Sequence, residues 1–216
     1  MNSMTNYIVS MTAAVALLTG ACHAADTPAA KPAATPAAKP AAASAPATAA
    51  PAQRWVQGPG SSLTFTFDQA GAASKGTFKQ FSTELVYDEK SAASGSLNVK
   101  IQIASIDTQD QERNDMLATS DLFDTPKFPT AQYTASTFSK TAAGGLEAVG
   151  KLTLRGVTHD LRLPLKIVTT ATGLELSGAT AIKRLDYGVG QGDWKSTEGV
   201  ADEVKVQYKV ALVKAK

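Results

Sequence analysis

Histidine and cysteine, which often serve as general bases, nucleophiles or metal ligands, are scarce in this chain. The sequence has two histidines and one cysteine in 216 residues. His23 follows Cys22 near the N-terminus, and His159 lies between Thr158 and Asp160, where we expect a solvated hairpin loop. One cysteine permits no intramolecular disulfide and no cysteine-based metal site. We therefore predict that the protein is not an enzyme and holds no metal.

Two polar clusters could instead bind a ligand, and each has a simpler structural interpretation. The segment 188–192, GVGQG, is glycine-rich like a phosphate-binding loop, but no helix-forming run follows it, which favours a flexible loop at a barrel mouth. Arg113 and Asp115 could cap a helix or close such a mouth, and we favour a structural salt bridge over contact with a ligand headgroup. Their neighbours Met116 and Leu117 are expected to point into the mouth.

The charge balance argues against a nucleic-acid partner. Lysine and arginine total 21 against 19 acidic residues, which gives a formal net charge of +2, and the basic residues are scattered singly. Such a pattern is typical of solvated strand faces rather than of a phosphate-binding patch.

Alternation of apolar and polar residues after residue 54 predicts the elements that would position a site. It is clearest over 146–167, where two strands flank a loop at 155–160 and share one apolar face. Such a ribbon cannot bury its apolar face alone, so more strands of the same kind are expected. The same alternation predicts strands at 63–67, 76–87, 97–103, 131–138, 174–182 and 204–212.

Together these segments make eight sequential strands with no long helical crossover, which favours an all-β antiparallel barrel. Closure removes exposed edges, and eight strands leave a lumen that side chains fill or that holds one small ligand. Ala148, Gly150 and Gly178 fall on the inward face and would leave volume empty. A short helical insert is expected within 110–123 at one end of the barrel.

Two irregularities are expected in the sheet. The spacing from Phe78 to Phe81 breaks the period of two and indicates a bulge near Lys79 and Gln80 that bends a long strand. Pro164 has no N–H to donate to a ladder, so we expect a bulge or irregular pairing there.

The N-terminal quarter predicts export and a tether. Residues 1–24 resemble a signal peptide with an apolar core, and residues 25–53, rich in alanine and proline, predict a disordered linker before a barrel over 54–216. Two alternatives remain for Cys22: lipidation, as in bacterial lipoproteins, or removal by cleavage after Ala24. The protein is therefore expected to be periplasmic or secreted, and tethered to a membrane if Cys22 is lipidated.

Several separated motifs resemble the YceI family of bacterial polyisoprenoid-binding proteins. They are the run 106–123, IDTQDQERNDMLATSDLF, then Phe128 to Ala131, then Gly150 to Thr158, and they occur in the family's order. The stretch 184–190 with Trp194 resembles a subgroup found beside di-haem cytochrome b membrane proteins. This resemblance implies a lipocalin-like barrel that carries an isoprenoid lipid, either a polyprenyl chain or an isoprenoid quinone, in its lumen.

The combined prediction is non-catalytic binding of an isoprenoid lipid or quinone, with no other cofactor required. Two alternatives remain: an accessory protein of a membrane cytochrome b redox system, and a structural envelope protein with a filled barrel. The side chains predicted to line the lumen and bind lipid are Phe65, Phe67, Phe78, Leu97, Val99, Ile101, Met116, Leu117, Tyr133, Leu152, Leu163 and Trp194.

Overall fold

The computed structural model describes residues 53–87, 95–141 and 145–215. The predicted signal peptide, Cys22 and the linker up to residue 52 lie outside the described residues. The prediction placed the linker's end at Gln53, but the structure makes this residue the start of the first strand.

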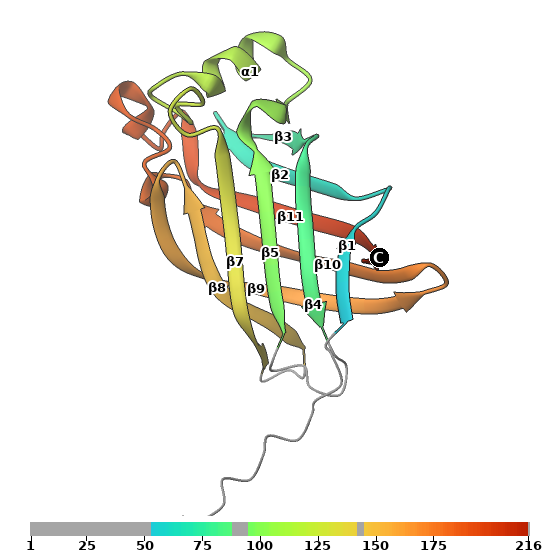
Figure 1. The fold of residues 1–216 in the computed structure, drawn as a ribbon. Coiled ribbons are helices and arrows are strands. Elements are labelled where there is room, and N and C mark those ends of the chain that lie inside the picture. The colour runs from blue at the N-terminus through green and yellow to red at the C-terminus, as the bar shows by residue number, and fades with distance from the viewer. Residues whose placement is uncertain (1–52, 88–94, 142–144, 216) are drawn as a thin grey trace, which may run out of the picture. The chain divides into compact units, whose positions relative to one another are not determined.

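Antiparallel strands close into a ring, as the alternation predicted (Figure 1). In the described residues the ring has eight members, in the order β1-β4-β5-β7-β8-β9-β10-β11, and it closes where Trp55 pairs with Lys214 and Val56 with Val213. Their bounds are β1 Gln53–Gln57, β4 Phe81–Tyr87, β5 Ser96–Gln102, β7 Thr130–Lys140, β8 Leu146–Leu154, β9 Val157–Thr170, β10 Gly173–Lys183 and β11 Val200–Lys214.

Three further strands widen the barrel at the end that carries the helix (Figure 1). β2 (Ser62–Gln69) pairs with β11, β3 (Ala72–Phe78) pairs with β2, and the short β6 (Ile106–Asp107) pairs with β3. The prediction of one long bent strand over 76–87 was therefore only partly right. The chain bends at Lys79 and Gln80, but the two halves are separate strands, because β3 pairs with β2 whereas β4 pairs with β1 and β5.

The predicted helical insert is α1 (Gln111–Ala118), which lies at one end of the barrel (Figure 1). Asp110 caps it, since its side chain accepts a hydrogen bond from the Arg113 backbone N–H at 3.0 Å. Asn114 Oδ1 accepts from the backbone N–H and the hydroxyl of buried Thr108, at 2.9 and 2.7 Å. The insert is thus fixed to the end of β6. No helix among the described residues has the length and apolarity needed to span a membrane.

Short 3₁₀ turns complete this end of the barrel. They are η2 (Ile103–Ser105), between β5 and β6, and η3 (Leu185–Tyr187) and η4 (Gly192–Lys195), between β10 and β11.

The hairpin predicted at 146–167 is present, but its loop is shorter than expected. β8 ends at Leu154 and β9 starts at Val157, so only Arg155 and Gly156 form the turn, with φ of 50° and 76°. Positive φ at both central residues is the geometry of a type I′ turn, which fits the twist of the flanking strands. His159 therefore lies in a strand opposite Leu152, rather than in a solvated loop as predicted.

Pro164 affects one side of β9 only. Its pairing with Glu147 of β8 is in regular register, contrary to the predicted bulge. On the opposite side, β9 pairs with β10 only from Lys166 to Thr170, so the ladder stops just after the proline. The wall between β9 and β10 consequently has a stretch without ladder hydrogen bonds, which follows from the missing N–H of proline.

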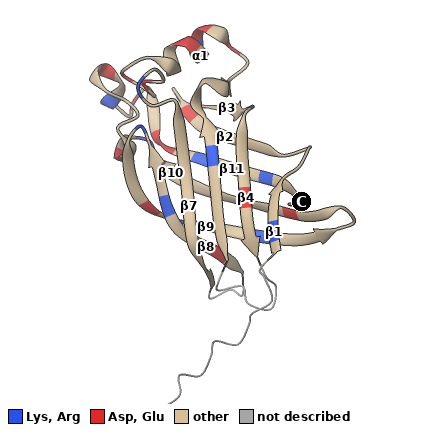
Figure 2. Cartoon of the chain, viewed as in Figure 1, with Lys and Arg blue, Asp and Glu red and all other residues tan. Residues whose placement is uncertain are grey.

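Opposite charges alternate on the outside of the barrel (Figure 2). Cross-strand ion pairs include Arg54 with Glu84 at 2.9 Å and Lys151 with Asp160 at 2.6 Å. These groups are largely exposed, so each pair contributes little to stability, and their mixture leaves the described surface without a broad basic face.

Apolar side chains completely fill the end of the barrel that lies away from α1. Their exposed fractions are 0% for Leu85 and 1% for Leu212, with Phe138, Ala148 and Leu174 also buried. None of these five lines the cavity described below, and all five belong to one cluster of buried apolar side chains, so this end is a packed core. The open volume of the barrel must therefore lie between that core and α1.

Candidate functional site

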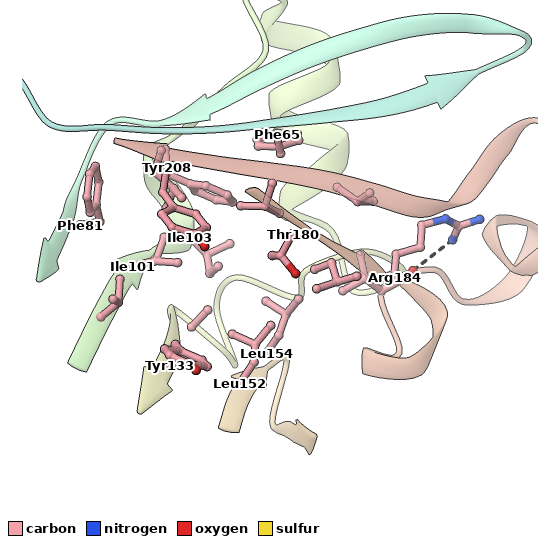
Figure 3. A pocket seen from close by; sticks show the side chains of 18 of the residues that line it. Phe65, Phe81, Ile101, Ile103, Tyr133, Leu152, Leu154, Thr180, Arg184 and Tyr208 are labelled. Atoms are coloured by element: carbon pink, nitrogen blue, oxygen red, sulfur yellow. Dashed lines mark hydrogen bonds between the residues drawn. The ribbon is translucent and has the colours of Figure 1, made fainter. Parts of the chain in front are cut away.

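The upper part of the barrel encloses a cavity of about 210 Å³. Side chains from several strands converge on it, among them Phe65, Ile101, Leu152 and Leu154 (Figure 3). Among the described residues its polar lining is limited to Gln69, Thr83, Arg113, Tyr133, Thr180, Arg184 and Tyr208. An apolar wall with a few polar groups is typical of a site for a largely apolar small molecule.

All the side chains predicted to line the lumen lie on this cavity: Phe65, Phe67, Phe78, Leu97, Val99, Ile101, Met116, Leu117, Tyr133, Leu152, Leu163 and Trp194. Val99 and Ile101 are only half-buried, although β5 lies between two paired strands and both residues point inward. A filled barrel would bury them fully. Their contact with a ligand stays a prediction, but their position beside open volume is observed.

Two tyrosines cross the lumen wall in the same way. Tyr133 of β7 donates its hydroxyl to the carbonyl of Ala148 at 2.9 Å and lies 3.2 Å from the carbonyl oxygen of Leu161 on β9. Tyr208 of β11 donates to the Pro164 carbonyl, also on β9. The Tyr208 ring passes Gly178 on the strand between, β10, where an added Cβ would overlap the ring and its hydroxyl.

These tyrosines replace part of the ladder that β9 lacks. The two side chains come from strands on either side of β9 and reach its carbonyls from the lumen, and the Tyr208 bond lies where pairing with β10 has stopped. Burial raises the pKa of both phenols above the ordinary value, with a smaller contribution from Glu147 at Tyr133 and from Tyr133 at Tyr208. Both hydroxyls therefore stay protonated and act as donors.

The predicted salt bridge between Arg113 and Asp115 is not formed. Arg113 Nη2 instead lies 3.6 Å from Asp110 Oδ2, and Asp115 Oδ1 accepts from Gln111 Nε2 at 2.7 Å. On a helix, residues two apart do not face each other, whereas residues three and four apart do. Arg113 also lines the mouth of the cavity beside Met116, which is 38% exposed.

Arg184, which sequence reasoning did not select for the site, organises the other side of the mouth. It is 5% exposed, and its guanidinium donates to five backbone carbonyls between Val189 and Ala201 at 2.6 to 3.1 Å. Burial lowers its pKa, and nearby Asp202 opposes that shift. The signal in the sequence was a lone arginine directly after a strand and before a glycine-rich segment.

The glycine-rich segment at 188–192 lies at the mouth, as predicted, and is held by backbone hydrogen bonds. Asp121 O accepts from the backbone N–H groups of Gly190 and Gln191, at 3.0 and 2.7 Å. These bonds join the segment to the loop after α1, so the two loops form one rim around the mouth.

Thr83 is a polar residue of the cavity wall that the sequence prediction also missed. It lies on β4 between inward-facing Phe81 and Leu85 and lines the cavity with 1% exposure. Its hydroxyl has no hydrogen-bond partner among the described residues. A polar residue at an apolar position of the alternation was the signal, since Thr83 shares its parity with both neighbours.

His159 lies near η3, at the edge of the barrel. Its ring meets the Tyr187 ring edge-on at 5.1 Å between centroids, and Nε2 lies 3.0 Å from the Asp186 carbonyl oxygen. No group of histidine, cysteine or acidic side chains among the described residues has the arrangement of a metal site. His159 therefore acts as a packing and hydrogen-bonding residue of the rim.

Comparison with known proteins gives a consistent match over the barrel. Residues 56–212 match the model of the YceI-like domain. Protein YceI of Escherichia coli O157:H7 is 40% identical over 93 residues, which are 43% of this chain and 48% of that protein. A UPF0312 protein of Photorhabdus laumondii is 35% identical over 120 residues, which are 52% of this chain and 62% of that protein. The chain thus spans about half the length of the curated relatives it matches.

Two solved structures share the architecture. BcnA of Burkholderia cenocepacia superposes with a TM-score of 0.67 at 31% identity, over 69% of this chain and 94% of BcnA. A polyisoprenoid binding domain from Saccharophagus degradans, implicated in plant cell wall breakdown, superposes with a TM-score of 0.58 at 17% identity, over 76% and 99% of the two chains. The second likeness concerns the fold alone.

Proposed function

The chain belongs to the YceI-like domain family, and from this premise we propose that it binds an isoprenoid lipid in the barrel lumen without transforming it. The observation that carries the proposal is the cavity of about 210 Å³ inside the barrel, whose described wall is apolar apart from a few groups. Three of those polar residues, Tyr133, Tyr208 and Arg184, already donate to the protein's own carbonyls.

The size of the cavity fits part of a long apolar chain. A dry cavity of about 150 Å³ is enough to hold benzene, so this lumen accommodates a ring or a short apolar segment. Each CH₂ group removed from water contributes about 0.8 kcal/mol. A few isoprene units therefore offset the entropy lost when a flexible chain is confined, and the rest of a longer chain would leave through the mouth.

The name of the Saccharophagus domain supports a polyisoprenoid as the ligand class. Within that class we propose a polyprenyl chain or an isoprenoid quinone. Carriage would take place in the cell envelope, because residues 1–24 have the pattern of an export signal. Intact-mass analysis of the protein from its native host tests this location: we expect either a diacylglyceryl addition at Cys22 or a chain that starts at Ala25. A retained, unmodified Cys22 would contradict both.

Lipid extraction provides the direct test of binding. The full chain is purified without detergent and extracted with organic solvent, and the extract is analysed by mass spectrometry. We expect an isoprenoid lipid in an amount approaching that of the protein. If the protein is natively folded and its extract contains no lipid, the barrel is a structural module and the proposal is wrong.

A further inference from the structure

The Thr83 hydroxyl is the one polar group of the described cavity wall that we find both deeply buried and without a partner. Its side chain is 1% exposed, and no described residue accepts or donates a hydrogen bond at Oγ1. Buried hydroxyls in folded proteins nearly always have a partner, and those without one call for an explanation. Tyr133 and Tyr208, which line the same cavity, both have carbonyl partners.

Thr83 lies at the closed end of the cavity, which we call the floor. The floor is where the last lining residues, Thr83, Leu97, Leu176 and Val210, meet the packed core around Leu85 and Leu212. Thr83 pairs with Val99, which lies four residues from Ile103 at the mouth end of β5. At about 3.3 Å per residue, Thr83 is thus roughly 13 Å from that point along the strand direction.

The cations of the described wall lie at the other end. Arg113 comes from α1, and Arg184 follows β10 at the rim, where carbonyls already take its donors. A charged group at the floor would be buried without a counter-charge, which is strongly unfavourable. An uncharged oxygen has no such penalty and can accept a hydrogen bond from a threonine hydroxyl.

From this arrangement we infer that Thr83 is the specificity-determining residue for a neutral oxygen of the ligand, so that an isoprenoid alcohol or quinone enters with its polar end first. The inference rests on the proposed lipid-binding function and adds the headgroup class and the orientation. A diphosphate headgroup is excluded from the floor and stays at the mouth near Arg113.

Three probes separate these cases: geranylgeraniol, the hydrocarbon that lacks its hydroxyl, and geranylgeranyl diphosphate. Each is titrated into the delipidated full chain, and binding is followed by tryptophan fluorescence, because Trp194 lines the cavity. The alcohol is expected to bind wild type more tightly than the hydrocarbon does. Thr83→Val keeps the side chain's shape and removes the hydroxyl, so it should weaken the alcohol about three- to tenfold. The hydrocarbon and the diphosphate should bind as before.

Matched variants test the position of the hydroxyl. Thr83→Ser retains the hydroxyl and should keep the preference for the alcohol. Thr134→Val makes the same chemical change on the exposed outer face of β7, away from the cavity, and should not alter the preference. Thermal unfolding without ligand shows whether Thr83→Val folds. If it does not fold, Thr83→Ala is used in its place.

The titrations distinguish failure of the lipid-binding function from failure of the inference about Thr83. If wild type binds none of the probes, the lipid-binding function fails. If wild type binds the alcohol and the hydrocarbon equally, or if Thr83→Val weakens all three ligands alike, the lumen still binds lipid but Thr83 does not select the headgroup.

Discussion

Glycine at one inward position, Gly178 of β10, allows Tyr208 to bridge the barrel wall. A Cβ on Gly178 would overlap the Pro164 carbonyl oxygen and the Tyr208 hydroxyl, the two atoms that form the bond to β9. Gly178→Ala should therefore lower the free energy of unfolding by about 1–3 kcal/mol, as overpacking does. Gly199→Ala is the matched control, since nothing lies within 4 Å of the added Cβ. Equal unfolding midpoints in urea for the two variants would contradict the bridge.

Glu147 joins three strands on the outside of the barrel and should make stability depend on pH. It accepts from Ser139 at 2.8 Å and from Arg162 at 2.5 Å, and these bonds, the serine's first, lower the pKa of its carboxyl. A lowered folded-state pKa stabilises the protein above the ordinary glutamate pKa of about 4.3, and that stability is lost as the pH falls.

Glu147→Gln should accordingly unfold at a lower temperature than wild type at pH 7, and the difference should shrink below about pH 4. Thermal melts at pH 7 and pH 3 measure it. A difference that is unchanged at pH 3 would mean that the carboxyl's charge is not its source.

At the scale of elements, one side chain, Arg184, makes five of the hydrogen bonds that hold the loop from η3 to β11. Replacing Arg184 by leucine leaves five carbonyl acceptors at the rim without their donor. We expect a loss of at least about 2 kcal/mol, and faster amide hydrogen exchange over 185–201, whereas β5 and β7 keep their relative protection. Arg162→Leu, which removes an exposed guanidinium from β9, is the control. Uniformly faster exchange throughout the barrel would show that Arg184 supports the whole fold rather than the loop.

The strands could be predicted from the sequence because inward and outward positions alternate cleanly. The antiparallel barrel followed from this alternation, and all twelve of the predicted lumen side chains line the cavity, but the strand that closes the ring did not follow. β1 was missed because QRWVQ lacks a clear alternation and directly follows the alanine- and proline-rich stretch. The turn at Arg155 was missed because arginine rarely adopts positive φ. Arg184 acts through carbonyl partners in a different segment, and Thr83 is distinguished by a hydroxyl that has no partner among the described residues. The alternation of apolar and polar residues contains no information about either feature.

At the scale of the whole molecule, the lumen should tolerate added volume where the packed core would not. Val99→Trp introduces a large ring beside the cavity. In a filled barrel this change would cost about 1–3 kcal/mol or more. In an open lumen the delipidated protein should lose much less, while the lipid recovered by extraction falls sharply. Lys100→Trp, on the outward face of the same strand, should leave the bound lipid unchanged. Severe destabilisation of a parent protein that carries no lipid would indicate a filled core.

The ring can close only after its C-terminal strand has been synthesised. The last pairs of the barrel join Trp55 to Lys214 and Gln57 to Leu212, about 160 positions apart along the chain. At about 5–20 residues per second, roughly 10–30 s pass between the synthesis of these partners. During that time β1 has no β11 to pair with, and the inner apolar face is accessible from the side. The ring therefore stays open between β1 and β4 on one side and β11 on the other until the last strand of the chain joins it.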